Sequence, residues 1–345
     1  MERVRACDAR AIRMNGEVSL NVLRAGFLTS VQDLGRQGFR QSGVSPGGAL
    51  DPHAFRVANL LVGNDESAAG LEITLGGARL RFAGHRLIAW CGGDFDVRFG
   101  PKSIPPGHVA LIDASDALTI DRPRLGCRCW LAISGGVDVA PVLGSRSTDL
   151  RAGFGGFKGR ALRDGDEVSL GENSRSVKIL IEKLSKEKIA GWKPPHDWSS
   201  PAKREPILRF TRGFNWNAFG ASTLERFASE SFVVSPDSDR MGVRFEKPEF
   251  KRNDGSDLLS EAVAPGTVQV PPEGKPILLL NDCQTIGGYP KIAHVATVDL
   301  SIAAQLRAGN AVRFQEISLT DAQQLLIERG RQLEQFRCGL EPYFT

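Results

Sequence analysis

The stretch that decides the fold is residues 71–133, LEITLGGARLRFAGHRLIAWCGGDFDVRFGPKSIPPGHVALIDASDALTIDRPRLGCRCWLAI. Short apolar runs alternate here with Gly, Pro and Asp, a pattern that indicates β-strands separated by turns. Evenly spaced short strands are typical of a β-barrel or a β-sandwich. The strand–helix alternation of a doubly wound parallel sheet is absent from the pattern. We therefore predict a mainly β protein, with strands at 71–75, 79–82, 86–90, 95–99, 108–112, 117–120 and 128–133.

One short helix is predicted just before this stretch. Asp51 is a suitable N-cap, and Pro52 suits the first helical position because its missing N–H would be unpaired there anyway. Phe55 and Leu61 belong to an apolar face at helical spacing, and Gly63 ends the run. A strand at 18–25 and a glycine-punctuated loop at 26–48 precede the helix.

The rest of the chain repeats the pattern of a strand, a short helix and further strands. Ser222 and Glu225 have capping-box spacing and predict a short helix, and Thr320 and Gln323 predict the start of a last helix at about 321–335. The Pro-, Ser- and charge-rich stretch 185–205 is typical of a linker. We predict domains at 17–184 and 206–318, the linker between them, and a helical tail at 319–345. Further strands are predicted at 167–170, 207–211, 232–235, 241–245, 267–270, 277–281, 294–298 and 311–315.

Composition excludes several classes of protein. The 345 residues are 41% hydrophobic and 24% charged, with a net charge of +4 spread over mixed charges, so no nucleic-acid-binding run is present. No apolar run reaches transmembrane length, and the arginine-rich start has no apolar core of a signal peptide. The six cysteines show no CxxC pair and the five histidines are scattered, which argues against a metal site. We expect a cytoplasmic protein with reduced cysteines.

The densest polar, glycine-rich segment is 281–291, NDCQTIGGYPK, directly after an apolar strand. A rigid strand that presents polar groups on a loop is a common way to build a site. Gly287 and Gly288 allow a close approach of the backbone to a ligand. The alternative is a tight hairpin turn with a packed tyrosine. The candidate side chains are Asp282, Gln284 for an amide or lactam, Thr285, Tyr289 for stacking, and Lys291 for an anion.

Two further segments are candidates. In 236–242, Arg240 is suited to bind a carboxylate or phosphate as a planar fork, unless Asp239 holds it in a local ion pair. The loops 29–36 and 43–51 lead into a helix N-terminus, which favours anions, unless Asp51 is only a cap. The candidates in these loops are Gln32, Asp33, Gly47 and Asp51.

Long ordered motifs give the chain a family resemblance. They are GFLTSVQDLGRQGFRQSGVSPGGALDPHAFRVANLLVGNDESAAGLEITLGGARLRF (26–82), ISGGVDVAPVLGSRSTDLRAGFGGFKGRALRDGD (133–166), DSDRMGVRF (237–245) and PGTVQVPPEGKPILLLNDCQTIGGYPKIAHV (265–295). Together they resemble the biotin-dependent carboxyltransferase family, also described as allophanate hydrolase subunit 2. The resemblance covers nearly the whole chain after about residue 17.

The resemblance implies two cyclophilin-like β-barrel domains, a C-terminal helix and partner chains. In bacteria such chains mostly resemble the C component of an ATP-dependent 5-oxoprolinase. That component works with a B component, of the carboxyltransferase subdomain B type, and with an A component. The implied reaction converts 5-oxo-L-proline to L-glutamate with ATP, and Mg²⁺ is expected with the nucleotide. On this view Arg240 and Lys291 supply charge, Gln284 and Tyr289 orient the lactam, and Asp282 or Asp33 handles a metal ion or a proton.

Two other activities stay open within the resemblance. One is carboxyl transfer to urea or a related amide, with biotin carried on another protein because this chain has no biotinyl-lysine motif. The other is regulatory, as an antagonist of a histidine-kinase inhibitor. The chain departs from the usual family pattern in the loop 47–51, which reads GGALD where SGAMD is usual, at Ile286 in place of threonine, and at Cys283 in place of a small residue. The Cys283 position argues against a thiol nucleophile, and Ile286 bears on the substrate more than on the fold.

Overall fold

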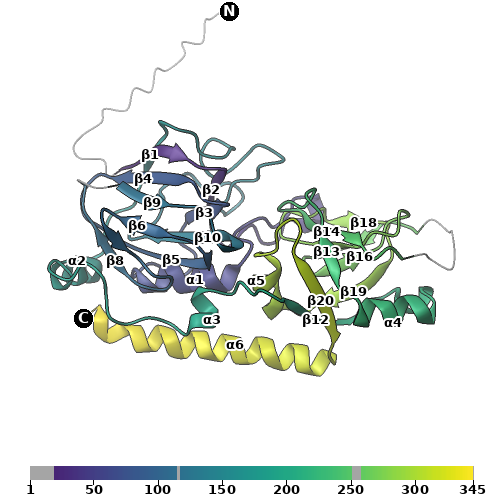
Figure 1. Ribbon diagram of the computed structural model, residues 1–345. Coiled ribbons are helices and arrows are strands. Elements are labelled where there is room, and N and C mark those ends of the chain that lie inside the picture. Colours follow the sequence, from purple (N-terminus) through teal and green to yellow (C-terminus); the bar gives the residue numbers. More distant parts are fainter. Residues whose placement is uncertain (1–18, 115–116, 251–257, 345) are drawn as a thin grey trace, which may run out of the picture.

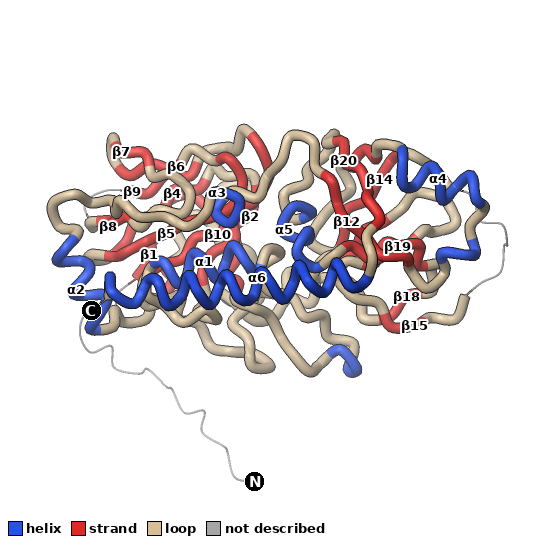
Figure 2. Tube along the Cα trace, turned by 90° about the horizontal axis from the view of Figure 1, so that it is seen from below, coloured by secondary structure: helices blue, strands red, loops and turns tan. Residues whose placement is uncertain are grey.

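The protein consists of two β-rich bodies that lie side by side (Figure 1). The computed structural model describes residues 19–114, 117–250 and 258–344. The mainly β fold predicted from the sequence is confirmed. A long helix, α6 (Leu319–Leu340), runs beneath the first body and reaches the near side of the second (Figures 1 and 2).

The first body contains two antiparallel sheets around one core. Their strand orders are β11-β1-β4-β9-β6-β7 and β2-β3-β10-β5-β8. Apolar side chains from both sheets, such as Leu80 and Leu131, are fully buried together. The strands are β1 (Ser19–Ala25), β2 (Leu28–Gln32), β3 (Gly70–Thr74), β4 (Ala78–Phe82), β5 (Arg86–Asp94), β6 (Val97–Phe99), β7 (Lys102–Ser103), β8 (Ala110–Ile112), β9 (Ala117–Ile120), β10 (Leu125–Ile133) and β11 (Glu167–Ser169).

Helix α1 (Pro52–Leu61) covers the second sheet by packing on β5 and β10. It begins as predicted, because Asp51 caps it by accepting a hydrogen bond from the Ala54 N–H at 3.0 Å. Phe55 and Leu61 are completely buried, so the predicted apolar face is the packed face. Burial of such side chains supplies about 1.5–3 kcal/mol each, which fixes the helix on the sheet.

The second body is a closed barrel with the order β12-β19-β16-β17-β14-β13-β20. Its ring is closed by the parallel pair β12–β20, and closure leaves no sheet edge open to other chains. Five phenylalanines fill the interior with edge-to-face and stacked contacts: Phe210, Phe227, Phe232, Phe245 and Phe314. The strands are β12 (Ile207–Arg212), β13 (Phe232–Val234), β14 (Gly242–Lys247), β16 (Thr267–Gln269), β17 (Ile277–Leu279), β19 (Lys291–Val295) and β20 (Ala311–Glu316).

Smaller elements surround the two bodies. A two-stranded sheet of β15 (Glu261–Ala262) and β18 (Ile286–Gly287) lies at the barrel's edge. The short helices are α2 (Arg175–Lys183), α3 (His196–Ser199), α4 (Ala221–Ser229) and α5 (Leu300–Ala303), with 3₁₀ turns η1 (Arg40–Ser42), η2 (Trp216–Ala218), η3 (Thr297–Asp299) and η4 (Glu341–Tyr343). In the described ranges no helix combines the length and the apolar character that crossing a membrane requires.

The predicted linker packs against the rest of the protein. It contains α3, whose Trp198 is buried between His53 and Phe336, with ring centroids at 4.9 Å and 5.7 Å. Trp192 contacts Tyr343 at 4.6 Å. The linker is therefore held between α1 and α6.

The structure corrects three local predictions. Strand β2 lies inside the segment predicted as a loop, because Leu28–Gln32 pairs with β3 along its whole length. Helix α4 begins one residue before Ser222, after Gly220, without a side-chain cap. Helix α6 begins after Ser318, not after Thr320, because Ser318 accepts the hydrogen bond from the Asp321 N–H.

The true cap of α6 can be tested against the one that the sequence pattern favoured. We expect Ser318→Ala to lower the free energy of unfolding by about 1 kcal/mol, since it removes the 3.0 Å bond to Asp321. The matched change Thr320→Ala is expected to stay within about 0.5 kcal/mol. Urea unfolding of both variants measures the difference, and equal losses would contradict the assignment.

Candidate functional site in the cleft between the two bodies

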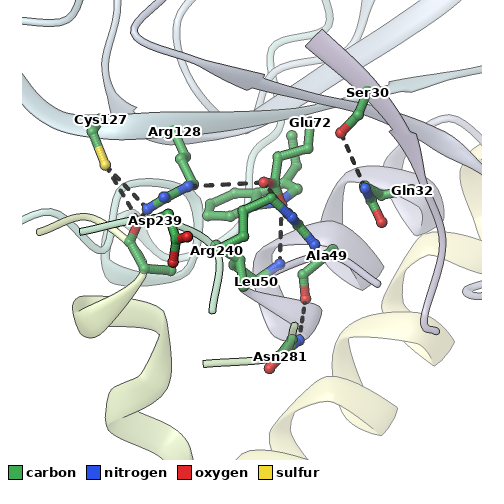
Figure 3. A network of polar contacts seen from close by, with 12 residues as sticks. Ser30, Gln32, Ala49, Leu50, Glu72, Cys127, Arg128, Asp239, Arg240 and Asn281 are labelled. Atoms are coloured by element: carbon green, nitrogen blue, oxygen red, sulfur yellow. Dashed lines mark hydrogen bonds and ion pairs between the residues drawn. The ribbon is translucent and has the colours of Figure 1, made fainter. Parts of the chain in front are cut away.

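Arg240 connects the two bodies through buried ion pairs. It lies in the turn before β14 and is 5% exposed. Its Nε and Nη2 donate to the two carboxylate oxygens of Asp282 at 2.8 and 3.1 Å. Its Nη1 donates to Glu72 on β3, and its Nη2 donates to the Gly48 carbonyl at 2.6 Å. The guanidinium of the second body therefore holds a strand and a loop of the first body (Figure 3).

Glu72 is the centre of this network on the first body's side. It is 1% exposed, and its Oε2 accepts from the Leu50 N–H at 3.0 Å and from the Trp130 indole at 2.8 Å. Arg128 lies 3.8 Å from its other oxygen. Burial acts to raise the pKa of Glu72, but Arg240 and Arg128 hold that pKa below its ordinary value. Glu72 is therefore charged, and each of its two oxygens faces partners that fix it.

Asp282 is the member of the network that faces the cleft. Burial raises the pKa of the Asp282 carboxyl above its ordinary value, and the attraction of Arg240 opposes this rise. Gly48 has φ +81°, and a Cβ there would approach the Gly35 nitrogen to 2.7 Å, so only glycine permits the loop to bring its carbonyl to Arg240. The loop 43–51 and the segment 236–242 are therefore joined by this contact.

Two cavities open on either side of Asp282 and Arg151, which line both. The Gln284 cavity has a volume of about 590 Å³, and the Phe27 cavity has a volume of about 620 Å³. Both sizes suit small-molecule ligands. The Gln284 cavity is lined by Gly43, Val44, Ser45, Asp149, Arg151, Ala152, Phe154, Asp282, Cys283, Gln284, Thr285 and Ile286. The Phe27 cavity is lined by Phe27, Leu28, Thr74, Arg128, Leu150, Arg151, Ser238, Asp239, Arg240, Met241 and Asp282.

Gln284 presents an amide without a hydrogen-bond partner among the described residues to the cavity. Its amide makes no hydrogen bond to any residue in the described part of the chain, and it is half-buried. It lines the Gln284 cavity and also a smaller Tyr289 cavity of about 260 Å³ at the edge of the barrel. An amide side chain both donates and accepts, so Gln284 can bind a planar amide or lactam on its edge.

The segment 281–291 meets the first body at the cleft. Asp282, Gln284 and Thr285 line the Gln284 cavity, while Asp239 and Tyr289 line the Tyr289 cavity beside it. Gly287 is the last residue of β18, and Gly288 follows it. A Cβ on Gly288 would lie 3.0 Å from the Leu258 carbonyl oxygen. These glycines serve the pairing of β18 with β15 and the turn after it.

Other predicted residues lie elsewhere or are already bound. Arg240 does not face a ligand as a free fork, because its hydrogen bonds run to Asp282, Glu72 and Gly48. Asp239 does not pair with it and instead accepts from the Met241 and Gly242 N–H groups. Lys291 pairs with Glu261 on the surface of the barrel. Gln32 is fully buried and donates to Ser30 and Thr148.

The remaining predicted loop residues, Asp33, Gly47 and Asp51, make structural contacts and do not line the Gln284 or Phe27 cavities. Asp33 accepts from Ser145 Oγ at 2.6 Å, from the Gly35 N–H and from the Arg146 N–H, so it fixes the loop around it. The Gly47 N–H donates to the Asn281 carbonyl at 3.2 Å. Asp51 caps α1 and lines a different cavity, between α1 and α6.

Several residues of the site were not foreseen from the sequence: Arg36, Glu72, Arg128, Asp149 and Arg151. Asp149 lines the Gln284 cavity and accepts from the Ala152 N–H at 2.8 Å and from Ser45 at 3.3 Å. Arg36 is buried, donates to the Ser147 carbonyl and lies 4.6 Å from the centre of the Phe154 ring. A signal did exist for Glu72 and Arg128, since charged residues inside apolar strands are rare unless they are paired.

Cys283 lines the Gln284 cavity but is an unreactive thiol. Burial raises its pKa to about 11, and Arg40 opposes the rise only in part. The thiolate is the reactive form, so little of it is present at neutral pH. Among the described residues, Cys91, Cys127, Cys129, Cys283 and Cys338 form no disulfide, and no group of three or more His, Cys, Asp and Glu is placed to hold a metal ion.

The charge of Asp51 makes a pH-dependent prediction. Burial raises the pKa of Asp51 from 3.8 to about 6 in the folded state. The folded state therefore loses stability as the pH rises from about 4 to about 6, because Asp51 ionises there in a buried position. Asn also caps helices but carries no charge. We expect Asp51→Asn to be more stable than the wild type by roughly 1–2 kcal/mol at pH 8, and by less at pH 4. Urea unfolding at the two pH values measures this, and a difference that does not grow with pH would contradict it.

The fold and the cleft define a class of protein: two β bodies, one of them a closed barrel, whose polar site is built at their junction. A family model described as carboxyltransferase domain, subdomain A and B, matches residues 42–316, and the chain belongs to this family.

Relatives of the chain fall into two groups. It is 39% identical to the C subunit of 5-oxoprolinase from Escherichia coli, over 93% of this chain and 98% of that protein. It is 32% identical to the C subunit of 5-oxoprolinase from Haemophilus influenzae, over 92% and 97%. Among solved structures, urea carboxylase of Kluyveromyces lactis matches 94% of this chain with a TM-score of 0.83 and 28% identity, but this chain spans only 30% of that one.

Proposed function

We propose that this chain is the C-type subunit of an ATP-dependent 5-oxoprolinase. The observation that carries the proposal is the match to the E. coli protein of that type, which extends over 98% of its length. The match also extends over 93% of this chain, so it includes residues of both bodies. The partners in the proposed complex are the A and B components of the enzyme, and the complex is cytoplasmic.

The proposed reaction explains why a cleft of this kind is needed. A lactam resists hydrolysis because resonance stabilises its amide. Transfer of the terminal phosphoryl group of ATP to the lactam oxygen activates the carbonyl carbon. A first water then adds to this carbon and the C–N bond breaks, which opens the ring to an acyl phosphate, and a second water hydrolyses the acyl phosphate to the carboxylate and phosphate. The net reaction converts 5-oxo-L-proline, ATP and two waters to L-glutamate, ADP and phosphate. The protein has to supply positive charge and hydrogen-bond donors around the reacting oxygen.

Three residues of the cleft fit these tasks. Gln284 has the free amide that orients a lactam. Arg151 lines both cavities, and its side chain, which contacts Met241, supplies the positive charge that the sequence pattern assigned to Arg240 and Lys291. Arg240 acts as a positioning residue, because it holds Asp282 at the mouth of both cavities. We assign ATP and Mg²⁺ to a site shared with the partner chains, to which Asp149 would offer one carboxylate.

Carboxyl transfer is the second candidate. The likeness to urea carboxylase, with a TM-score of 0.83, favours it. In that case the same amide, Gln284, would bind urea or a related amide, and biotin would arrive on another protein.

The deciding experiment is glutamate release from 5-oxo-L-proline by the complex of this chain with its A and B partners. We expect release that needs both ATP and this chain. A folded, assembled complex that releases no glutamate, yet carboxylates urea with a biotin carrier, would replace the first proposal with the second.

A further inference from the structure

A separate cavity of about 270 Å³ lies between three helical elements, α1, α6 and the η3–α5 turn. Figure 2 shows α6 passing along α1 and α5. We call it the helix cavity. Its polar lining includes Asp51, His53, Arg56, Asn281, Ser301 and Arg329. Asn281 is the neighbour of Asp282 in the chain, so adjacent residues of one segment line the helix cavity and the cleft.

Two buried polar atoms of this cavity have no partner within the described residues. Asp51 is 1% exposed, and although its Oδ1 caps α1, its Oδ2 makes no hydrogen bond. The Nε2 of His53 is buried and unpaired as well. Burial and the nearby arginines keep the pKa of His53 low, at about 3, so the ring is neutral. Unpaired buried polar atoms cost about 1–3 kcal/mol each, so such atoms at a cavity are places where water or a bound group is held.

Arg329 supplies the opposite charge from the facing helix. It is half-buried on α6 and makes no hydrogen bond or ion pair to the residues that the structure describes. Burial raises the pKa of Asp51, and the charge of Arg329 opposes that rise, so the two groups lie within electrostatic reach of each other. They do not touch. The cavity therefore separates a carboxylate oxygen from a guanidinium, and neither has a partner among the described residues.

We propose that the helix cavity binds a small carboxylic acid that also carries an N–H donor. The ligand's carboxylate pairs with Arg329, for which a guanidinium fork is well suited. Its N–H group donates to Asp51 Oδ2, and the His53 Nε2 takes a second hydrogen bond. The volume corresponds to roughly nine water molecules of ~30 Å³ each, which suits a ligand of about ten heavy atoms. A free α-amino acid has this size and this pair of groups.

A bound ligand at this position would stabilise the cleft through Asn281. The Asn281 side chain donates to the Ala49 carbonyl at 2.8 Å, and its own carbonyl accepts from Gly47. Between these two residues, the Gly48 carbonyl accepts from Arg240. Asn281, which lines the helix cavity, therefore holds the loop 47–49 whose Gly48 carbonyl accepts from Arg240. The choice of L-glutamate as the probe rests on the proposed function, in which glutamate is the product and this cavity senses it.

The test is binding of L-glutamate to the full chain, by calorimetric titration and by thermal unfolding. We expect saturable binding to the wild type and a rise in its unfolding temperature. Arg329→Gln and Asp51→Asn are each expected to weaken binding at least tenfold. Arg331→Gln, two residues along α6 on an exposed position, is the matched control and should bind as the wild type does. Acetate, which lacks the N–H donor, should not raise the unfolding temperature.

Two further comparisons separate this cavity from the cleft. Gln284→Ala removes the lactam-binding amide of the cleft, so the saturable glutamate binding that this variant retains reports the helix cavity. Undiminished binding by Arg329→Gln, or no saturable binding to the wild type at millimolar glutamate, would overturn the proposal. Because this assay uses the chain without its partners or ATP, a complex that fails to release glutamate from 5-oxo-L-proline would refute the proposed function and leave the binding result standing.

Discussion

Arg240→Ala is expected to lower the free energy of unfolding by about 3–5 kcal/mol, a large part of the stability of a typical domain. The guanidinium is almost completely buried and neutralises two carboxylates, Glu72 and Asp282. Its removal leaves Asp282 without its cation and leaves Glu72 with Arg128, at 3.8 Å, as its remaining cation. The loss is the cost of those stranded charges, and it exceeds what the ion pairs themselves contribute to stability.

The measurement is urea unfolding of the purified full chain, with Arg313→Ala as the control. Arg313 lies on β20 of the same barrel, is exposed and has no side-chain partner among the described residues. Its loss should stay within about 0.5 kcal/mol. Arg240→Lys keeps the charge but loses the planar fork, so we expect an intermediate loss. If Arg240→Ala changed stability no more than Arg313→Ala does, Arg240 would not hold the two bodies together.

The strands could be predicted because their signal is local. An apolar run that ends at Gly, Pro or Asp is visible in a few residues, and the observed strands mostly lie within a residue or two of the predicted ones. Strand β2 was missed because polar residues such as Thr29, Ser30 and Gln32 occupy it. All three are buried by contacts with distant segments, which no local pattern reveals.

The candidate site was predictable as a set of segments but not as a set of side chains. Glu72 and Arg240 are 168 positions apart in the chain, and only the docking of the two bodies brings them together. The fold of the second body pairs Lys291 with Glu261, whereas the docking of the two bodies brings Arg151 to the cleft, so the expected source of charge and the proposed one differ. Residue type indicated the chemistry, while the packing of the bodies decided which residue carries it.

Gln284 is the residue for which sequence and structure agree most closely, and its loss is expected to affect activity most. We expect Gln284→Ala to lower kcat/KM for 5-oxo-L-proline by about 10²–10³-fold in the assembled complex, the size of effect seen when one oriented donor is removed from a reacting oxygen. Stability should change little, because the amide makes no hydrogen bond to the described residues. Gln323→Ala, an exposed glutamine on α6, is the control.

A fall in kcat with KM unchanged would place the amide's contact in the transition state, whereas a rise in KM alone would mean that Gln284 only binds the ring. Activity equal to that of the control variant would show that Gln284 is not part of the site. The lactam would then be assigned to the Phe27 cavity, which Gln284 does not line.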